Sequence, residues 1–228
     1  MFMFDPMYFI LILPALILAT WAQSKVRGAF EKNSRIRARS GLSGAEVARS
    51  ILDRSGLDNV SVEPLDSAGL GDHYDPRSQE IRLSRDVYSG DSLAALGIAA
   101  HEAGHALQHS SGYLWLGIRN TIIPVTMFGS KLAFPLFFIG LLMRGEFLMT
   151  LGIVFFATAV VFQLITLPVE YNASSRAVRI LEGERFITSS EVPAVQEVLD
   201  AAALTYLAAA LMAVMQLLYL LLLRGRRR

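Results

Sequence analysis

Residues 92–109 read SLAALGIAAHEAGHALQH, and the rest of the chain is best interpreted outward from this stretch. Ser92 precedes an alanine-rich apolar run, which predicts a helix that begins there or one residue earlier and continues to about His109. His101 and His105 are four residues apart, so a helix places both imidazoles on one face with a rise of roughly 6 Å. One zinc ion (Zn²⁺) can bridge that distance.

Glu102 brings a carboxylate to the same motif, directly beside His101. Zinc lowers the pKa of water and polarises a carbonyl group, while a carboxylate can take a proton from the attacking water and pass one to the leaving amine. Glu102 is therefore the predicted catalytic residue of an H-E-x-x-H hydrolase. Coincidence is the alternative, but three of the four histidines fall within nine residues of this helix. Gly104 costs the helix about 1 kcal/mol relative to Ala, which favours close packing of another element there.

A third metal ligand must come from elsewhere in the chain, because a catalytic zinc site uses three protein ligands and leaves the fourth position open. His109 extends the same helix face, but roughly 12 Å of rise separates it from His101, too far for one ion. Glu170 is the best candidate, since it begins a polar segment just after a predicted membrane hairpin. Alternatively, Glu170 only stabilises the N-terminus of a helix that starts there.

The composition indicates a membrane protein. Of the 228 residues, 53% are hydrophobic, and the mean hydropathy is +0.43, too apolar for a soluble globule. The chain has no cysteine, which excludes disulfides, thiolate metal sites and cysteine nucleophiles. A net charge of +1 argues against a nucleic-acid partner. The predicted partners are the lipid bilayer and a protein or peptide substrate, and nothing in the sequence indicates an oligomeric state.

Four apolar runs account for this composition, and each is a candidate membrane span. They cover about 7–22, 122–143, 147–167 and 204–223. Lys131 is the only charged residue within them, and it either snorkels toward the membrane interface or marks a partly re-entrant segment. A transporter or channel is disfavoured, because the runs lack the chain of ionisable residues that a polar pathway requires.

The runs and the polar segments between them divide the chain into five predicted parts. These are an N-terminal transmembrane anchor (1–22), a soluble domain with the metal helix (23–120), a transmembrane hairpin (121–168), a polar helical segment with the third zinc ligand (169–203) and a C-terminal transmembrane helix with a basic tail (204–228). In the soluble domain, Ser43 and Glu46 form a capping box that predicts a helix over 45–55. Two strands are predicted near 59–65 and 80–84.

Four stretches of this sequence together resemble the bacterial YugP-type family of membrane zinc metallopeptidases, along nearly the whole chain. They are HEAGHALQH (101–109), DHYDPR (72–77), IRLS (81–84) and PVEYNASSRA (168–177). The chain is also distantly similar to membrane zincins that mature prenylated proteins or control membrane-protein quality. In those enzymes a Glu in a Glu-x-x-Ala-Asp helix completes the zinc site. Glu170 fits that position, whereas Ser174 stands where the pattern has Asp.

The four apolar runs predict a mainly α membrane protein with about four transmembrane helices, and the resemblance implies a small α+β zincin-like domain over 23–120. It implies a gluzincin-like zinc metallopeptidase with His101, His105 and Glu170 as ligands. It further implies that an edge strand beside the metal helix binds the substrate in extended form, with 80–84 as the candidate. His73, Tyr74 and Tyr171 each offer a donor to the oxyanion. A structural role is the commoner alternative for each of them, and none is named as a catalytic residue.

The function predicted from the sequence is that of a zinc-dependent endopeptidase acting on membrane or membrane-proximal proteins. The alternative is a non-catalytic zinc-binding scaffold or regulator, against which an intact Glu102 weighs because a structural site needs no base. The predicted location is the bacterial cell membrane, crossed several times. Basic residues near the predicted spans are more numerous on the catalytic side, which favours a cytoplasmic active site.

Overall fold

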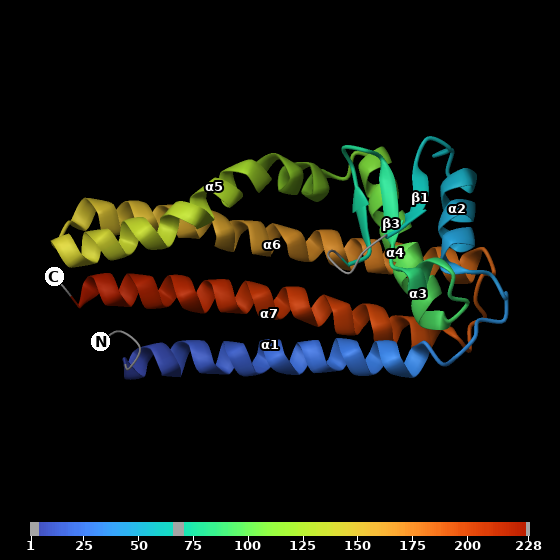
Figure 1. Ribbon diagram of the computed structural model, residues 1–228, viewed down its shortest axis with the longest axis horizontal. Coiled ribbons are helices and arrows are strands. Elements are labelled where there is room, and N and C mark those ends of the chain that lie inside the picture. The colour runs from blue at the N-terminus through green and yellow to red at the C-terminus, as the bar shows by residue number, and fades with distance from the viewer. Residues whose placement is uncertain (1–4, 66–70, 227–228) are drawn as a thin grey trace. The chain divides into compact units, whose positions relative to one another are not determined.

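The computed structural model describes residues 5–65 and 71–226, which form seven helices and a three-stranded sheet (Figure 1). The elements are α1 (Pro6–Asn33), α2 (Gly44–Arg54), β1 (Ser61–Pro64), β2 (His73–Asp75), β3 (Glu80–Leu83), α3 (Arg85–Tyr88), α4 (Leu93–Ser110), α5 (Leu114–Met143), α6 (Glu146–Gly183) and α7 (Val192–Gly225). The mainly helical fold class is therefore confirmed. Residues 1–4 of the predicted anchor and 227–228 of the basic tail lie outside the described residues.

The chain forms two compact units, which are described separately. The unit that we call the helix unit comprises residues 1–23, 117–168 and 204–228. The other, which we call the site unit, comprises residues 24–116 and 169–203. The five-part division of the chain into domains stays a prediction.

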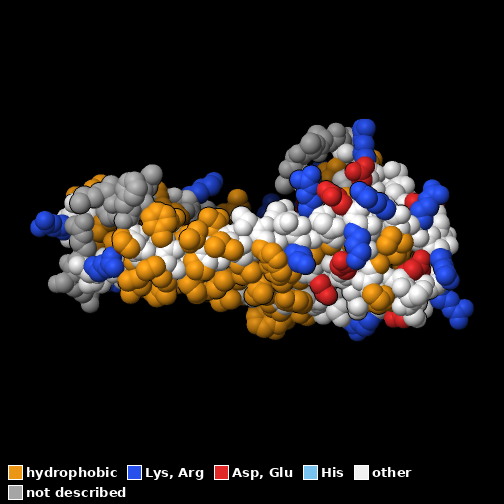
Figure 2. Space-filling view, turned by 90° about the horizontal axis from the view of Figure 1, so that it is seen from below, with side chains coloured by type: hydrophobic (Ala, Val, Ile, Leu, Met, Phe, Trp, Pro, Cys, Tyr) orange, Lys and Arg blue, Asp and Glu red, His pale blue; other side chains and the backbone are white. Residues whose placement is uncertain are grey.

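The helix unit has the composition of a membrane-embedded bundle. Four helices, α1, α5, α6 and α7, are long and apolar enough to cross a membrane. Large hydrophobic side chains are exposed on them, with Leu142 at 78% and Phe147 at 75% exposure, and Figure 2 shows hydrophobic side chains crowding the surface of this unit. A soluble monomer rarely exposes such a continuous apolar surface. The hydrocarbon core of a membrane is itself apolar and can contact such a surface without a hydration cost.

In the site unit, the sheet has the order β1-β3-β2. The prediction that the strand near 80–84 is an edge strand is therefore wrong. β3 pairs in parallel with β1 on one side and antiparallel with β2 on the other. Both of its hydrogen-bonding edges are occupied, so the strand predicted near 80–84 is central and cannot accept an extended peptide as an edge strand. β2 was not predicted from the sequence, because it has only three residues and precedes a turn.

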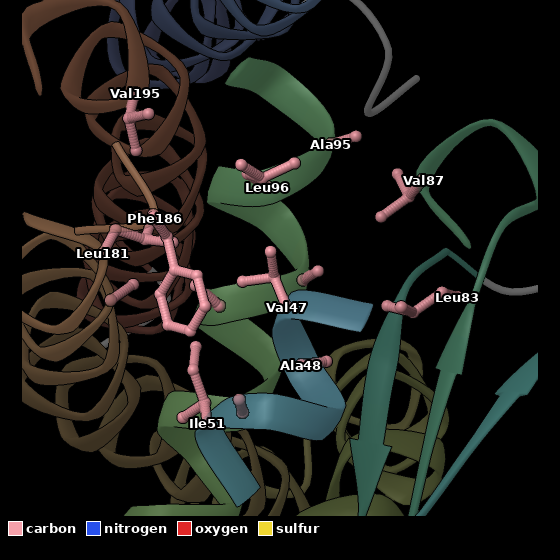
Figure 3. Close-up of a cluster of buried hydrophobic side chains, with 14 of the residues drawn as sticks. Val47, Ala48, Ile51, Leu83, Val87, Ala95, Leu96, Leu181, Phe186 and Val195 are labelled. Atoms are coloured by element: carbon pink, nitrogen blue, oxygen red, sulfur yellow. The ribbon is translucent and has the colours of Figure 1, made fainter. Parts of the chain in front are cut away.

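The core of the site unit holds α4 in place. The capping box predicted at Ser43 and Glu46 is present, with the Ser43 side chain accepting from the Glu46 N–H and the Glu46 carboxylate accepting from the Ser43 N–H. Behind this cap, α2 buries one face, and Figure 3 shows Val47, Ile51 and Phe186 within one hydrophobic cluster. Full burial of such a side chain contributes about 1.5–3 kcal/mol. The cluster therefore anchors α2 and α4 against the last turns of α6.

Glu170 lies inside α6, which corrects the expectation that a new helix starts there. α6 is continuous from Glu146 to Gly183 and contains Pro168. A proline inside a helix removes one backbone hydrogen bond and usually kinks or ends the helix, yet α6 continues past it. Stabilisation of a helix N-terminus therefore does not explain Glu170, and its carboxylate needs another role.

Candidate metal centre

The local sequence of α4 fixes two of the three candidate ligands. The helix begins at Leu93, close to the start predicted from the sequence, and its N-cap is Ser92, whose Oγ accepts a hydrogen bond from the Ala95 N–H at 3.2 Å. His101 and His105 lie on the same face, with ring centroids 4.7 Å apart and ring planes at 88°. The helical repeat alone produces this pairing, because it places residues four apart one above the other.

Glu170 of α6 completes the cluster. Its Oε2 lies 3.2 Å from His101 Nε2 and 3.5 Å from His105 Nε2. One ligand atom from each of the three residues lies within 4.8 Å of the other two. Glu170 is 2% exposed, and a carboxylate so deeply buried requires charged or hydrogen-bonding partners. The structure thus brings together the three residues that the sequence analysis singled out as metal ligands.

A close contact between α4 and α6 brings the three candidate ligands together. A Cβ placed on Gly104 would lie 3.0 Å from the Ala173 carbonyl oxygen and 3.4 Å from the Ala173 Cα. The expectation that another element packs closely against Gly104 is therefore confirmed, and that element is α6. Because Glu170 lies one turn before Ala173, the same contact brings its carboxylate to the histidine face of α4.

Gln108 fixes the orientation and tautomer of His105. Both hydrogens of its side-chain amide are donated, to the Val169 carbonyl at 2.8 Å and to Asn172 Oδ1 at 2.9 Å. Its Oε1 must then face His105 Nδ1, 3.0 Å away, as an acceptor. Nδ1 therefore carries the hydrogen, which leaves the Nε2 lone pair available for a metal. Gln108 was not predicted as a site residue, although its position three residues after His105 indicates that the two side chains lie close together on the helix.

Ser174 supports the other histidine. Its Oγ lies 3.1 Å from His101 Nδ1, so the Ser at the position of the Asp in the zincin pattern still contacts a ligand imidazole. A hydroxyl can accept the Nδ1 hydrogen as a carboxylate does, but it adds no negative charge. Both candidate ligands are thus held through Nδ1, and both direct Nε2 toward Glu170.

The donor set fits a zinc ion. Zinc binds imidazole nitrogen and carboxylate oxygen at about 2.0–2.2 Å, and tetrahedral coordination then separates neighbouring ligand atoms by about 3.4 Å. The two Nε2–Oε2 distances, 3.2 and 3.5 Å, lie close to that value. Two neutral imidazoles and one carboxylate are also a ligand set found in catalytic zinc sites.

Glu102 lies next to these ligands without being one of them. It is 7% exposed, and no described residue hydrogen-bonds to its side chain. Burial raises the pKa of Glu102 above its ordinary value, and attraction to His101 and His105 offsets this only in part. Burial lowers the pKa of His105, but the contact with Glu170, the charge of Glu102 and the hydrogen bond to Gln108 together outweigh that effect, so the net shift is upward. The cluster therefore favours bound positive charge, either as protons or as a metal cation.

The other polar residues named from the sequence lie outside the cluster. His109, on the last turn of α4, has its Nδ1 2.8 Å from the Tyr74 hydroxyl on β2. Burial raises the pKa of Tyr74, which keeps this hydroxyl protonated. His73 Nδ1 donates to the Gly71 carbonyl at 2.9 Å, and Tyr171 is largely exposed. A role for any of them at an oxyanion stays a prediction.

Comparison with known proteins agrees with this chemistry. The family described as "Putative neutral zinc metallopeptidase" matches residues 8–225. The chain is 50% identical over 223 residues to the "Putative membrane protease YugP" of Bacillus subtilis (strain 168), which covers 96% of this chain and 98% of that protein. No solved structure matches the chain.

Proposed function

Because this chain belongs to the family of putative neutral zinc metallopeptidases, we propose that it is a membrane-embedded zinc-dependent endopeptidase. The observation that carries the proposal is the meeting of His101, His105 and Glu170, whose ligand atoms lie within 4.8 Å of one another. The buried carboxylate of Glu102 stands beside them without a hydrogen bond from any described residue. A site made only to stabilise the fold would not need that carboxylate.

Each residue then has a distinct role in peptide hydrolysis. His101, His105 and Glu170 would hold zinc, with Gln108 and Ser174 fixing the two imidazoles. When bound, zinc supplies Lewis acidity that polarises the scissile carbonyl and lowers the pKa of water. Glu102 would accept the proton of the attacking water on its carboxylate and deliver a proton to the departing amine nitrogen. Its raised pKa brings it closer to neutral pH, where both transfers are efficient.

The proposed substrates are membrane proteins or proteins held close to the membrane. Four helices are long and apolar enough to cross a bilayer, and the relative from Bacillus subtilis carries the name of a membrane protease. An enzyme confined to the membrane meets substrates confined to the same surface at a high effective concentration.

We place the active site on the cytoplasmic side of a bacterial membrane, following the positive-inside rule. The chain has no cysteine, so single-cysteine variants can be labelled without background. A membrane-impermeant maleimide should label Arg144→Cys, between α5 and α6, in intact cells. Ser61→Cys, on β1, should react only after lysis. The opposite pattern would reverse the proposed orientation.

The decisive test of activity is the Glu102→Gln variant. The solubilised, zinc-loaded protein is assayed with a fluorogenic peptide library, with Glu63→Gln, an exposed carboxylate on β1, as the matched control. Glu102→Gln should lose about 10²–10⁴-fold in rate because the general base is gone, while zinc content stays unchanged. Glu63→Gln should keep its activity. Full proteolysis by Glu102→Gln would contradict the proposal.

The non-catalytic alternative makes a different prediction about coordination. A structural zinc site closes all four positions with protein ligands, whereas the cluster in the described part of the chain offers three. Cobalt-substituted protein gives a direct measurement, since an open position binds an added anion and changes the visible spectrum. A spectrum that no added anion perturbs would favour a scaffold over an enzyme.

A further inference from the structure

A second polar site lies in the helix unit, in a groove between α5 and α6. The groove has a volume of about 390 Å³. The residues that line it are Ile123, Thr126, Met127, Ser130, Lys131, Ala159, Phe162 and Gln163. Most of this surface is apolar, and its one charged residue is Lys131. No carboxylate or imidazole lines the groove, so its chemistry differs from that of the metal centre.

Lys131 lacks a counter-ion among the described residues. It is exposed and takes part in no ion pair or hydrogen bond within 5–65 and 71–226. An ammonium group within a membrane span is costly unless it pairs with an anion or reaches the interface. A charged residue within a membrane span is therefore a candidate functional site.

Two further polar groups in the groove also lack partners. The Thr126 hydroxyl is buried, with the residue 9% exposed, and has no hydrogen bond. The Gln163 amide makes no hydrogen bond to any residue that the structure describes. Ser130, by contrast, donates to the Thr126 carbonyl at 2.7 Å. In hydrocarbon each unsatisfied polar group costs free energy, so these groups favour a ligand that accepts hydrogen bonds.

We propose that this groove binds the phosphate of an anionic phospholipid, with an acyl chain along its apolar wall. A phosphodiester supplies the negative counter-charge that Lys131 lacks among the described residues, and it accepts hydrogen bonds from the Gln163 amide. Ile123, Met127 and Phe162 offer the apolar surface that an acyl chain requires. Basic pockets between membrane helices are known to take anionic lipid headgroups by this combination of charge and apolar contact.

The position of the groove along α5 agrees with this occupant. Lys131 lies twelve residues before Met143, where α5 ends, so about 18 Å of helix separates it from the end of the hairpin. In a hydrocarbon core about 30 Å thick, Lys131 therefore lies nearer the leaflet at the N-terminal end of α5 than the leaflet at the α5–α6 turn. Helical side chains lean toward the N-terminus of their helix, which directs the Lys131 ammonium toward the headgroups of that leaflet.

The test measures which lipid the full-length protein retains. The protein is reconstituted in phosphatidylcholine nanodiscs with and without phosphatidylglycerol, and bound lipid is counted by native mass spectrometry. Wild type should retain phosphatidylglycerol preferentially, and Lys131→Gln should bind it about tenfold more weakly because the charged hydrogen bond is lost. Lys131→Arg should keep most of the binding, since it keeps the charge.

Two further variants separate the groove from general surface charge. Arg144→Gln removes an exposed cation outside the groove and should leave lipid retention unchanged. Ala159→Phe fills the groove without changing charge and should abolish retention. An unchanged circular dichroism spectrum and melting temperature in each variant would show that the fold is intact, so a loss of lipid can be assigned to the groove.

Several results would overturn the proposal. One is undiminished retention of phosphatidylglycerol by Lys131→Gln, and another is an equal loss in Arg144→Gln. Displacement of the lipid by inorganic phosphate alone would show a site for a free anion. Crosslinking of Lys131 to an acidic segment of another protein, in place of lipid, would show that the groove binds a polypeptide.

Discussion

The metal centre of the site unit and the Lys131 groove of the helix unit differ in how their polar side chains find partners. In the metal centre, Gln108 and Ser174 hold the two imidazoles by Nδ1, and Glu170 faces both Nε2 atoms. In the groove, Lys131 has no partner among the described residues. The first site is preorganised by the protein itself, which is what catalysis requires. The second is complete only when something outside the chain enters it.

Removing a metal ligand should produce the largest effect. Glu170→Ala deletes one of three proposed ligands and leaves the two imidazoles facing a cavity. Zinc affinity should fall by more than about a hundredfold, beyond the 10–100-fold typical of losing a supporting residue. Equilibrium dialysis with a competing chelator measures this. If Glu170→Ala bound zinc with wild-type affinity, Glu170 would not be a zinc ligand.

A matched pair of Gln→Leu variants compares the two regions directly. Gln108→Leu removes the acceptor that holds His105 Nδ1 and leaves the Val169 carbonyl without its donor. Zinc should bind about 10–100-fold more weakly. Gln163→Leu makes the same chemical change in the groove and should leave zinc affinity unchanged while weakening lipid retention. Equal loss of zinc in both variants would show that the change acts through general stability.

The helix contact at Gly104 should have a smaller but measurable effect. Gly104→Ala places a methyl group 3.0 Å from the Ala173 carbonyl, and overpacking of this kind costs about 1–3 kcal/mol. The gain in helix propensity, about 1 kcal/mol, offsets part of that cost. Gly28→Ala in α1 meets nothing within 4 Å and should stabilise slightly. Thermal unfolding checks both, and a higher melting temperature for Gly104→Ala would contradict the close contact.

The pH dependence of metal-free stability should be the mildest effect. The folded-state pKa values of Glu102 and His105 are raised above their ordinary values of 4.5 and 6.5. A raised pKa stabilises the fold below the unfolded-state value, and this contribution is lost as pH rises through the folded-state value. Chelator-treated protein should therefore melt at a lower temperature at about pH 8 than at about pH 6. Glu102→Gln should reduce the dependence of melting temperature on pH. An unchanged dependence would show that Glu102 does not contribute to it.

Local signals in the sequence were sufficient for much of the fold. The α2 capping box, the α4 cap at Ser92 and the apolar runs each depend on residues within a few positions of one another. Signals for the sheet were weaker, because strand order depends on pairing between segments that are separate in the sequence. β2 is only three residues long, too short for an alternating pattern. The sequence does not show that β3 is central, because this depends on its pairing with both β1 and β2.

For the candidate site, the sequence by itself determined the pair on α4. His101 and His105 share a face because backbone hydrogen bonds fix the helical repeat, whatever surrounds the helix. Only the tertiary structure decided which distant residues face that pair. Glu170 lies 65 residues beyond His105, and it reaches the histidines because the absence of a side chain at Gly104 lets α4 approach Ala173. Gln108 reaches His105 within its own helix, but its contacts with Val169 and Asn172, and that of Ser174 with His101, depend on the same packing, which no local periodicity encodes.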